Sequence, residues 1–211
     1  MSWFSRSPAP AKAQAPQRVE REPELHRSLA LPEVMAAISK RPKARVLDLG
    51  PALGSNVDFF ARFGCKLYIE DLFSAVVESP VEGDERLDFA RHLESPDREP
   101  IDLVIAWDLF NYLSRKELLA LGRELAKLCR PGAMVFALLS YLKQIPAQPL
   151  RFRIQDEESL LYMPQSGGER PSPRYAPSEV ADLFSGFSVD RSFLLRHGYQ
   201  EYLLLRNASP L

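Results

Sequence analysis

Hydrophobic residues recur along the chain at two kinds of spacing. Near the amino end, apolar side chains at positions 29, 31, 34, 35 and 38 follow a helical period, and Pro32 stands near the start, where its missing N–H costs little. That helix should end before Pro42, because a proline disfavours helical backbone in the residue that precedes it. A second helical period covers residues 56–63 and stops at Gly64. Two amphipathic helices are therefore predicted.

Four short apolar runs alternate with helices. They cover residues 45–49, 66–69, 101–107 and 134–139. Strands with such continuous apolar runs belong inside a parallel sheet. Ser114 and Glu117 have the spacing of a capping box, which begins a helix that runs to about Cys129. Strands alternating with helices in this way predict an α/β fold with right-handed crossovers and a doubly wound, mostly parallel sheet.

Two segments have a less regular pattern. Residues 73–100 hold several prolines and many charges, and they predict only a short strand or turn near residues 86–89. Residues 143–174 are rich in proline, arginine and glutamine, and within them a hairpin is predicted between residues 152–155 and 160–163. The arginines of this second segment either face a polar or anionic substrate or are solvated on a surface loop.

The chain closes with a helix and two strands. The helix is predicted over residues 177–185 and ends at Gly186. The strands cover residues 187–195 and 201–206, with a short link around His197. Two consecutive strands with a short link pair antiparallel, so the parallel sheet should end in a hairpin.

Length and composition allow one folded domain. Of the 211 residues, 45% are hydrophobic and 26% charged, which is enough apolar material for one core. Residues 1–24 are rich in proline, alanine, glutamine and charge without periodicity, and predict a disordered tail. Residues 25–211 form the predicted domain. The chain has no apolar run long enough for a signal sequence or a membrane span, which predicts a cytoplasmic protein without a membrane partner.

Charge, cysteines and histidines narrow the chemistry. A formal net charge of −1 gives no overall attraction to nucleic acid, so no such partner is predicted. Cys65 and Cys129 stand in apolar segments and predict buried thiols in a reducing compartment. His26, His92 and His197 are far apart in the sequence, and their spacing predicts no metal site.

The segment VLDLGPALG, residues 46–54, joins a predicted strand to a helix through two glycines. Such a turn places backbone N–H groups at the carboxyl end of the strand, where α/β proteins bind ligands. Gly50 can take φ values closed to other residues, and Gly54 lets the chain enter the helix without a side chain in the way. The spacing is G-x-x-x-G with Pro51 inside it, which differs from the G-x-G-x-x-G that cradles a pyrophosphate. A phosphate-bearing cofactor is therefore disfavoured.

Two acidic residues, Glu70 and Asp71, follow the second predicted strand. A carboxylate at this place in an α/β fold can accept hydrogen bonds from both hydroxyls of a ribose. Asp71 lies 21 residues after Gly50, which leaves room for one helix and one strand. The alternative is a solvated turn, and the glycine turn nearby favours the functional interpretation.

These features together resemble the class I S-adenosylmethionine-dependent methyltransferases. VLDLGPALG resembles their first motif, close to LDxGxGxG, with Asp48, Gly50 and Gly54 matching and Ala52 at the middle glycine position. The run IDLVIAWDLFNYL resembles their fourth strand and its loop, and RELAKLCRPGAMVFALLS resembles the next helix and fifth strand. FSVDRSFLLRHGYQEYLLLR is similar to their antiparallel sixth and seventh strands. The resemblance spans roughly residues 40–206 and implies a mostly parallel seven-stranded sheet ending in an antiparallel hairpin.

The resemblance also implies S-adenosylmethionine as the cofactor. The residues implied for cofactor binding are Asp48, Gly50, Pro51, Ala52, Gly54, Glu70, Asp71, Asp88, Phe89 and Trp107. Ala52 in place of glycine narrows the space near the methionine part of the cofactor, and Pro51 stiffens the loop. Asp88 is assigned to the adenine, with Phe89 against its ring and Asp84 as the second choice.

The acceptor side is defined less sharply. The cofactor carries the difficult chemistry of methyl transfer, so a general base is optional. Asp108, at the end of the fourth strand, and its neighbour Tyr112 are the candidates for substrate-facing catalytic residues, the alternative being loop capping and core packing. Residues 143–174 occupy a common place for a substrate-side insertion. The prediction is methyl transfer to a small-molecule or protein acceptor. The alternative is a methyltransferase-like binding or scaffold protein without catalysis, which Ala52 favours.

Overall fold

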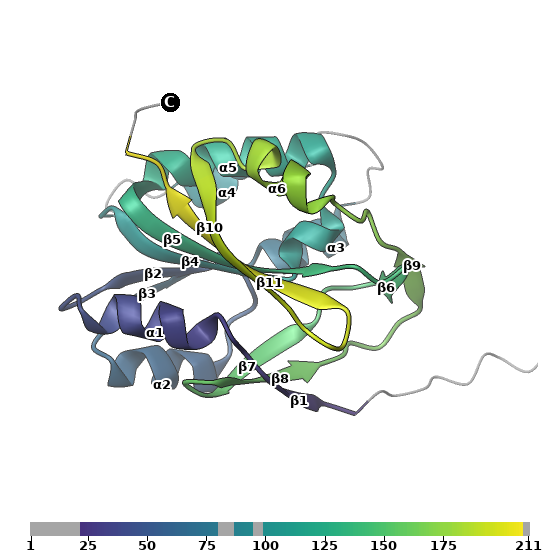
Figure 1. Cartoon of the computed structure of the whole chain (residues 1–211), viewed down its shortest axis with the longest axis horizontal. Coiled ribbons are helices and arrows are strands. Elements are labelled where there is room, and N and C mark those ends of the chain that lie inside the picture. Colours follow the sequence, from purple (N-terminus) through teal and green to yellow (C-terminus); the bar gives the residue numbers. More distant parts are fainter. Residues whose placement is uncertain (1–21, 80–86, 95–98, 209–211) are drawn as a thin grey trace, which may run out of the picture.

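The centre of the molecule is a six-stranded sheet (Figure 1). The computed structural model describes residues 22–79, 87–94 and 99–208. The sheet has the order β10-β11-β5-β4-β2-β3. Its strands are β2 (Arg45–Asp48), β3 (Lys66–Ile69), β4 (Ile101–Trp107), β5 (Cys129–Ser140), β10 (Phe187–Leu194) and β11 (Tyr199–Arg206). Strands β3, β2, β4 and β5 are parallel, and β11 and β10 continue the sheet antiparallel. The doubly wound sheet with a closing hairpin is confirmed.

The strand count differs from the prediction. Among the described residues the central sheet has six strands, not the seven implied by the resemblance. The segment predicted as a strand or turn near 86–89 begins outside the described residues, and Phe89 instead opens the short helix α4 (Phe89–Leu93). The Asp88 carboxylate caps this helix by accepting a hydrogen bond from the Arg91 N–H, which stabilises helical over extended backbone.

Helices cover both faces of the sheet. Helices α1 (Leu31–Ser39) and α2 (Gly54–Arg62) lie on one face, and α4, α5 (Arg115–Leu128) and α6 (Pro177–Leu183) on the other (Figure 1). The remaining helices are α3 (Leu72–Glu78) and the short 3-10 helix η1 (Leu109–Tyr112). The predicted capping box at the start of α5 is present, because Ser114 and Glu117 bond each other's backbone N–H groups. Among the described residues, no helix combines the length and hydropathy that crossing a membrane requires.

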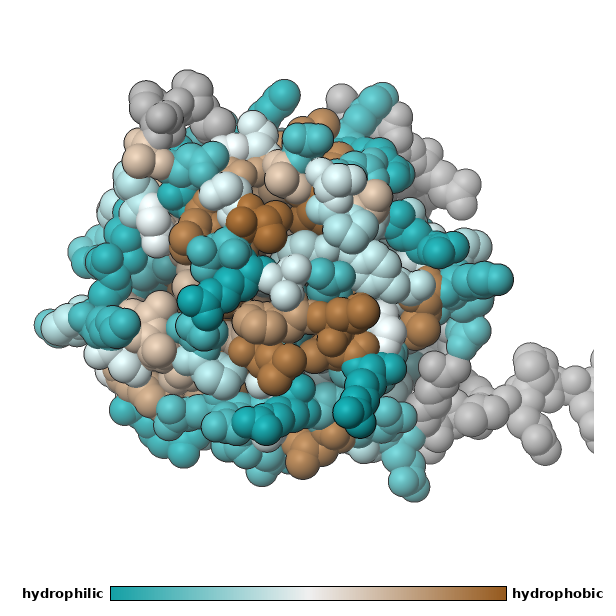
Figure 2. Space-filling model, viewed as in Figure 1, coloured by the Kyte–Doolittle hydropathy of each residue, from teal (hydrophilic) through white to brown (hydrophobic). Residues whose placement is uncertain are grey.

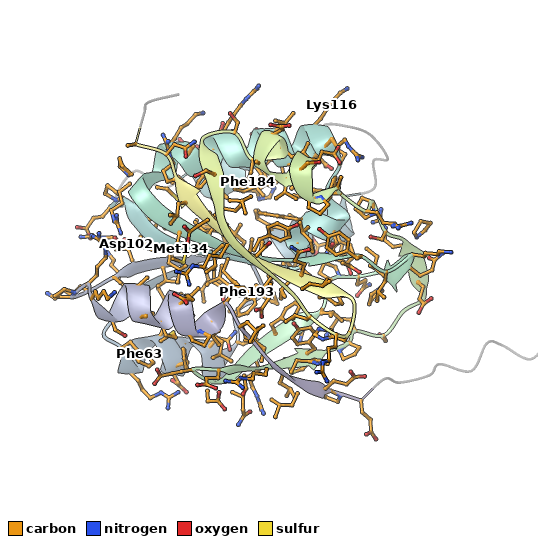
Figure 3. The ribbon with its side chains drawn as sticks, in the orientation of Figure 1. Phe63, Asp102, Lys116, Met134, Phe184 and Phe193 are labelled. Carbon is orange, nitrogen blue, oxygen red and sulfur yellow. The ribbon has the colours of Figure 1, made fainter. Side chains whose placement is uncertain are left out.

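The core explains the apolar pattern of the sequence. All seven residues of β4 are buried, as expected for a strand with helices on both faces. On the α5–α6 side, the ring of Phe184 packs against Phe110 and Phe187 between helices and sheet (Figure 3). A Cβ added to Gly122 would lie 3.3 Å from the Ser185 backbone nitrogen, so this glycine permits the close approach of α5 to the end of α6.

A second, smaller sheet lies against the first. Its order is β1-β8-β7, formed by β1 (Glu24–Arg27), β7 (Arg151–Asp156) and β8 (Ser159–Met163). The predicted hairpin is confirmed, with Phe152 opposite Tyr162. Within the same insertion, β6 (Gln144–Pro146) pairs with β9 (Glu169–Pro171).

Strand β1 was not predicted from the sequence. Glu24 falls in the segment predicted to be a disordered tail, yet it pairs with Tyr162 of β8. The side chain of Leu25 stays 61% exposed, so backbone pairing rather than apolar burial orders this strand. Residues 1–21 lie outside the described residues. On the face shown in Figure 2, apolar side chains gather beside the β10–β11 hairpin, and Leu29 and Leu194 are 44% and 70% exposed.

Candidate functional site

The glycine turn lies at the carboxyl end of β2, as predicted. Asp48 is the last residue of the strand, and its Oδ1 atom accepts a hydrogen bond of 2.9 Å from the Gly50 N–H. A Cβ added to Gly50 would lie 2.8 Å from Cδ1 of Trp107, a separation that real Cβ atoms do not show. Gly50 is therefore required by close packing. Gly54 begins α2, and a Cβ there would meet nothing within 4 Å, while Ala52 is exposed.

The indole of Trp107 covers this turn. Trp107 has a φ of +49°, a left-handed backbone that is rare for a bulky residue. Its Nε1 donates a hydrogen bond of 2.6 Å to Asp48 Oδ1, and its ring stacks on Phe152 at 5.3 Å with an interplanar angle of 2°. Both rings are 2% exposed. Such backbone strain costs about 1–3 kcal/mol, which the hydrogen bond and the ring stack offset.

The carboxyl group of Asp48 is electrostatically unusual. Burial raises its pKa to about 6, while the hydrogen bonds from the Gly50 N–H and the Trp107 indole act in the opposite direction. Sequence reasoning identified Asp48 and Trp107 as separate contributors to a cofactor site. In the structure the two side chains are bound to each other.

The two acids after β3 occupy different positions. The Glu70 N–H donates to the Asp48 carbonyl oxygen at 2.9 Å, so Glu70 adjoins the glycine turn and is half-buried. Asp71 is the N-cap of α3, and its carboxylate accepts hydrogen bonds from the Ser74 N–H at 3.0 Å and the Ser74 hydroxyl at 2.7 Å. Glu70 therefore lies beside the glycine turn, while the Asp71 carboxylate caps α3.

The residues assigned to the adenine belong to another surface. Asp88 caps α4, which packs against α5, and it lines a cavity with Glu124 and Lys127 of α5. Phe89 is 2% exposed and part of the core. This cavity contains none of the glycine-turn residues, and the assignment of Asp88 and Phe89 to the adenine stays a prediction. Asp84 lies outside the described residues.

The space beside the glycine turn is small. A cavity of about 120 Å³ lies next to Pro51, between α3 and the segment that leads into β7. Pockets that enclose a drug-sized ligand hold about 300–1,000 Å³. The Trp107 indole also packs against Gly50, so S-adenosylmethionine would need more room at the turn than this cavity gives.

Asn56 holds the small sheet over the turn. This side chain on α2 is 2% exposed; its Nδ2 donates to the Phe152 carbonyl oxygen and its Oδ1 accepts from the Ile154 N–H, both at 2.9 Å. The pair of bonds fixes β7 on α2 and thereby places Phe152 on Trp107. Sequence reasoning missed this residue. The usable signal was an asparagine at the start of the apolar helical period over residues 56–63.

We expect Asn56→Ala to lower the free energy of unfolding by about 2–4 kcal/mol, because it leaves the buried Phe152 carbonyl and Ile154 N–H without their partners. Urea denaturation of the full chain measures the change. Asn207→Ala, at an exposed position, is the matched control and should change stability by less than about 0.5 kcal/mol. An Asn56 variant as stable as the control would contradict the anchoring role.

The side chains of Asp108 and Tyr112 hold the start of the insertion, residues 143–174, by hydrogen bonds to its backbone. Asp108 is fully buried; its Oδ2 accepts from the Leu150 N–H at 3.1 Å, and no described residue donates to its Oδ1. Burial raises the pKa of Asp108 to about 8. The Tyr112 hydroxyl lies 3.1 and 2.9 Å from the carbonyl oxygens of Pro146 and Gln148, and burial raises its pKa. Both candidate catalytic side chains thus position residues 146–150.

A group of rings continues from the indole along one face of the small sheet. Phe152 contacts Tyr162 at 4.8 Å, and Tyr162 contacts the rings of His26, His197 and Tyr199. His197 lies in the turn between β10 and β11, as predicted, and stacks on His26 at 3.9 Å. Burial and the neighbouring His26 lower the pKa of His197 to about 4.

Comparisons with known proteins agree with the fold. The sequence profile of a family described as "Methyltransferase domain" matches residues 21–167. A comparison with curated proteins finds no significant match.

Among solved structures, an S-adenosylmethionine-dependent methyltransferase from Clostridium acetobutylicum ATCC 824 is similar, with a TM-score of 0.52, 11% identity and coverage of 83% of this chain and 89% of that chain. The PH0226 protein from Pyrococcus horikoshii OT3 has a TM-score of 0.51, 16% identity and coverage of 84% and 88%. A 1,6-didemethyltoxoflavin-N1-methyltransferase from Burkholderia thailandensis has a TM-score of 0.50, 16% identity and coverage of 85% and 77%.

These structures share the fold, and the family profile covers more than half of the chain. The α/β sheet with a closing hairpin and the glycine turn at the end of its first parallel strand stand where the resemblance placed them. The chain belongs to the methyltransferase domain family.

Proposed function

We propose that the protein transfers a methyl group from S-adenosylmethionine to a small-molecule or protein acceptor. The observation that carries the proposal is the Asp48–Gly50 turn at the carboxyl end of β2, with Glu70 beside it, in a chain of the methyltransferase domain family. Ligands of open α/β sheets bind at this edge. Because the Trp107 indole lies on Gly50, the indole must leave the turn before the cofactor can bind there.

The proposed cofactor side is narrower than the set predicted from the sequence. It comprises Asp48, Gly50, Pro51, Ala52, Gly54 and Glu70, while Trp107 controls access to them. Asp71 and Asp88 contribute by capping α3 and α4 rather than by contacting the ligand. The acceptor side is placed under residues 143–174, where Asp108 and Tyr112 hold the insertion.

A second candidate function is a binding protein without catalysis. The observation that favours it is the same indole: Trp107 donates a hydrogen bond to Asp48, stacks on Phe152 and packs against Gly50. A chain that never admits the cofactor would keep this arrangement permanently. Cofactor affinity separates the two functions.

We propose a cytoplasmic protein with a small-molecule or protein acceptor and no nucleic-acid partner. A net charge of −1 supports the absence of a polyanionic partner. Cys65 and Cys129 are free thiols, and burial raises the pKa of Cys129 to about 12, so it stays protonated in a reducing compartment.

Calorimetric titration with S-adenosylmethionine and S-adenosylhomocysteine tests the proposed function. We expect micromolar binding that Glu70→Gln weakens about tenfold or more, because a hydrogen bond to a charged group contributes about 1.5–3 kcal/mol. Asp71→Asn is the matched control and should bind like the parent, since asparagine also caps helices. Absence of binding at millimolar cofactor would overturn the enzyme proposal in favour of the binding protein.

A further inference from the structure

A cavity of about 640 Å³ lies at the end of the sheet opposite the glycine turn. It is formed by the end of α1, the loop after it, and the amino-terminal residues of β2, β4 and β5. Its lining residues are Ala37, Ile38, Lys40, Arg41, Pro42, Arg45, Asp102, Leu103, Arg130, Gly132 and Met134. Asp102 and Met134 lie next to each other at this end of β4 and β5 (Figure 3). Its volume is within the range of about 300–1,000 Å³ that holds small organic ligands.

The lining carries an excess of positive charge. Its four cationic side chains are Lys40, Arg41, Arg45 and Arg130, and its one acid is Asp102. Three positive charges are therefore not balanced within the lining. Glu99, just outside it, pairs with Arg45 at 2.6 Å and with Lys66 at 3.5 Å, so an excess of two positive charges remains once Arg45 is counted as paired.

Asp102 accepts hydrogen bonds from only some of the N–H donors of these cations. Its carboxylate contacts Arg130 Nε directly, but the nearest guanidinium nitrogens of Arg41 and Arg45 lie 3.6 and 4.0 Å away. A guanidinium carries five N–H donors, so one carboxylate cannot satisfy three of them. The buried Arg45 Nε has no hydrogen-bond partner among the described residues, and Lys40 makes no ion pair with any of them.

Part of the lining is apolar. Ile38 and Leu103 are buried, and Ala37 and Met134 are half-buried beside them. A ligand in the cavity would thus meet cations together with hydrocarbon from Ala37 and Met134. Guanidinium groups match the geometry of phosphate and carboxylate oxygens, and an excess of two positive charges suits a dianionic phosphate better than a monoanionic carboxylate.

We propose that this cavity binds a small phosphate monoester with an apolar body. The site is separate from the glycine turn, because β2 has Arg45 at one end and Asp48 at the other. The inference therefore stands or falls independently of methyl transfer.

Calorimetry of the full chain at low salt tests the site with 1-naphthyl phosphate, 1-naphthoate, 1-naphthol and inorganic phosphate. We expect saturable one-site binding, tightest for 1-naphthyl phosphate and at least tenfold weaker for the other three. Lys40→Gln combined with Arg41→Gln should weaken the binding of 1-naphthyl phosphate at least tenfold. Both side chains are exposed, so the Arg130–Asp102 contact in the parent fold is kept.

Lys143→Gln combined with Arg196→Gln is the matched control, because it removes two exposed cations elsewhere and should leave the affinity unchanged. If both double variants bound 1-naphthyl phosphate equally weakly, the loss of affinity would come from the overall charge, and the proposed site would be overturned. Equal affinity for 1-naphthoate or 1-naphthol would overturn the phosphate assignment. Failure of 1-naphthyl phosphate to saturate would overturn the whole inference.

Discussion

Trp107→Ala is expected to tighten the binding of S-adenosylmethionine about tenfold or more while lowering the free energy of unfolding by about 3–5 kcal/mol. In the parent chain the indole must give up its hydrogen bond to Asp48 and its stack on Phe152 before a ligand can reach Gly50. These contacts contribute about 1.5–3 and 0.5–1.5 kcal/mol, and relief of the left-handed backbone returns part of that sum. Calorimetry and urea denaturation give the two quantities.

Two further variants separate the blocking of Gly50 by the indole from a general loss of stability. Trp107→Phe keeps a ring over the turn but loses the bond to Asp48, so it should tighten binding less than alanine does. Phe136→Leu removes a buried ring that contacts Trp107 edge-on without covering Gly50, and it should lower stability with little effect on affinity. A folded Trp107→Ala chain that binds the cofactor more weakly than the parent would show that the indole holds the ligand rather than excludes it.

Asp108→Asn is expected to stabilise the protein above neutral pH. Burial raises the pKa of Asp108 from its ordinary value of 3.8 to about 8, so between these values the folded chain retains a proton that the unfolded chain has released. The free energy of unfolding of the parent therefore falls as pH rises through this window, by up to about 1.4 kcal/mol per pH unit. Asparagine has no proton to lose and keeps an oxygen for the Leu150 N–H.

The stability difference between variant and parent should thus be near zero at pH 4 and favour the variant at pH 8. Urea denaturation over this range measures it. Asp102→Asn provides a control of opposite sign: burial alone would raise the pKa of Asp102, but the bonds from Arg130 and Arg45 hold it below its ordinary value. That variant should be less stable than the parent at neutral pH, and the deficit should shrink only below about pH 4. A flat difference for Asp108→Asn would contradict a carboxyl group that is protonated in the fold.

Periodicity predicted the parts of the fold that rest on apolar burial. The continuous run of β4 and the alternation of strands and helices determined the sheet, and the closing hairpin followed from two strands with a short link. Ser114 and Glu117 predicted the start of α5 correctly, because a capping box is a local interaction that the sequence spacing shows. Strand β1 could not be predicted in this way, because its order comes from backbone pairing and ring contacts with residues far away in the sequence.

The sequence predicted the local turn of the candidate site but not the long-range contacts between its side chains. The turn at Asp48 and Gly50 is a local motif, and it lies where the motif implies. The stack of Trp107 on Phe152 depends on Asn56, which binds a strand almost a hundred positions later, and no local pattern records such a pair. Asp71 and Asp88 were assigned to the cofactor because each follows a predicted strand. In the structure each carboxylate accepts a hydrogen bond from the backbone N–H three residues later and thereby caps a helix.

The bond between Glu201 and the start of α1 has a consequence for synthesis on the ribosome. The Oε2 atom of this β11 residue accepts hydrogen bonds of 2.8 Å from the Leu29 and Ala30 N–H groups, which lie 172 and 171 positions earlier. The first helix is therefore made long before the carboxylate that completes its amino end. Until β11 has left the ribosome, these two N–H groups depend on water or a chaperone, and the start of α1 can reach its final place only afterwards. A strand made late thus completes a helix made early.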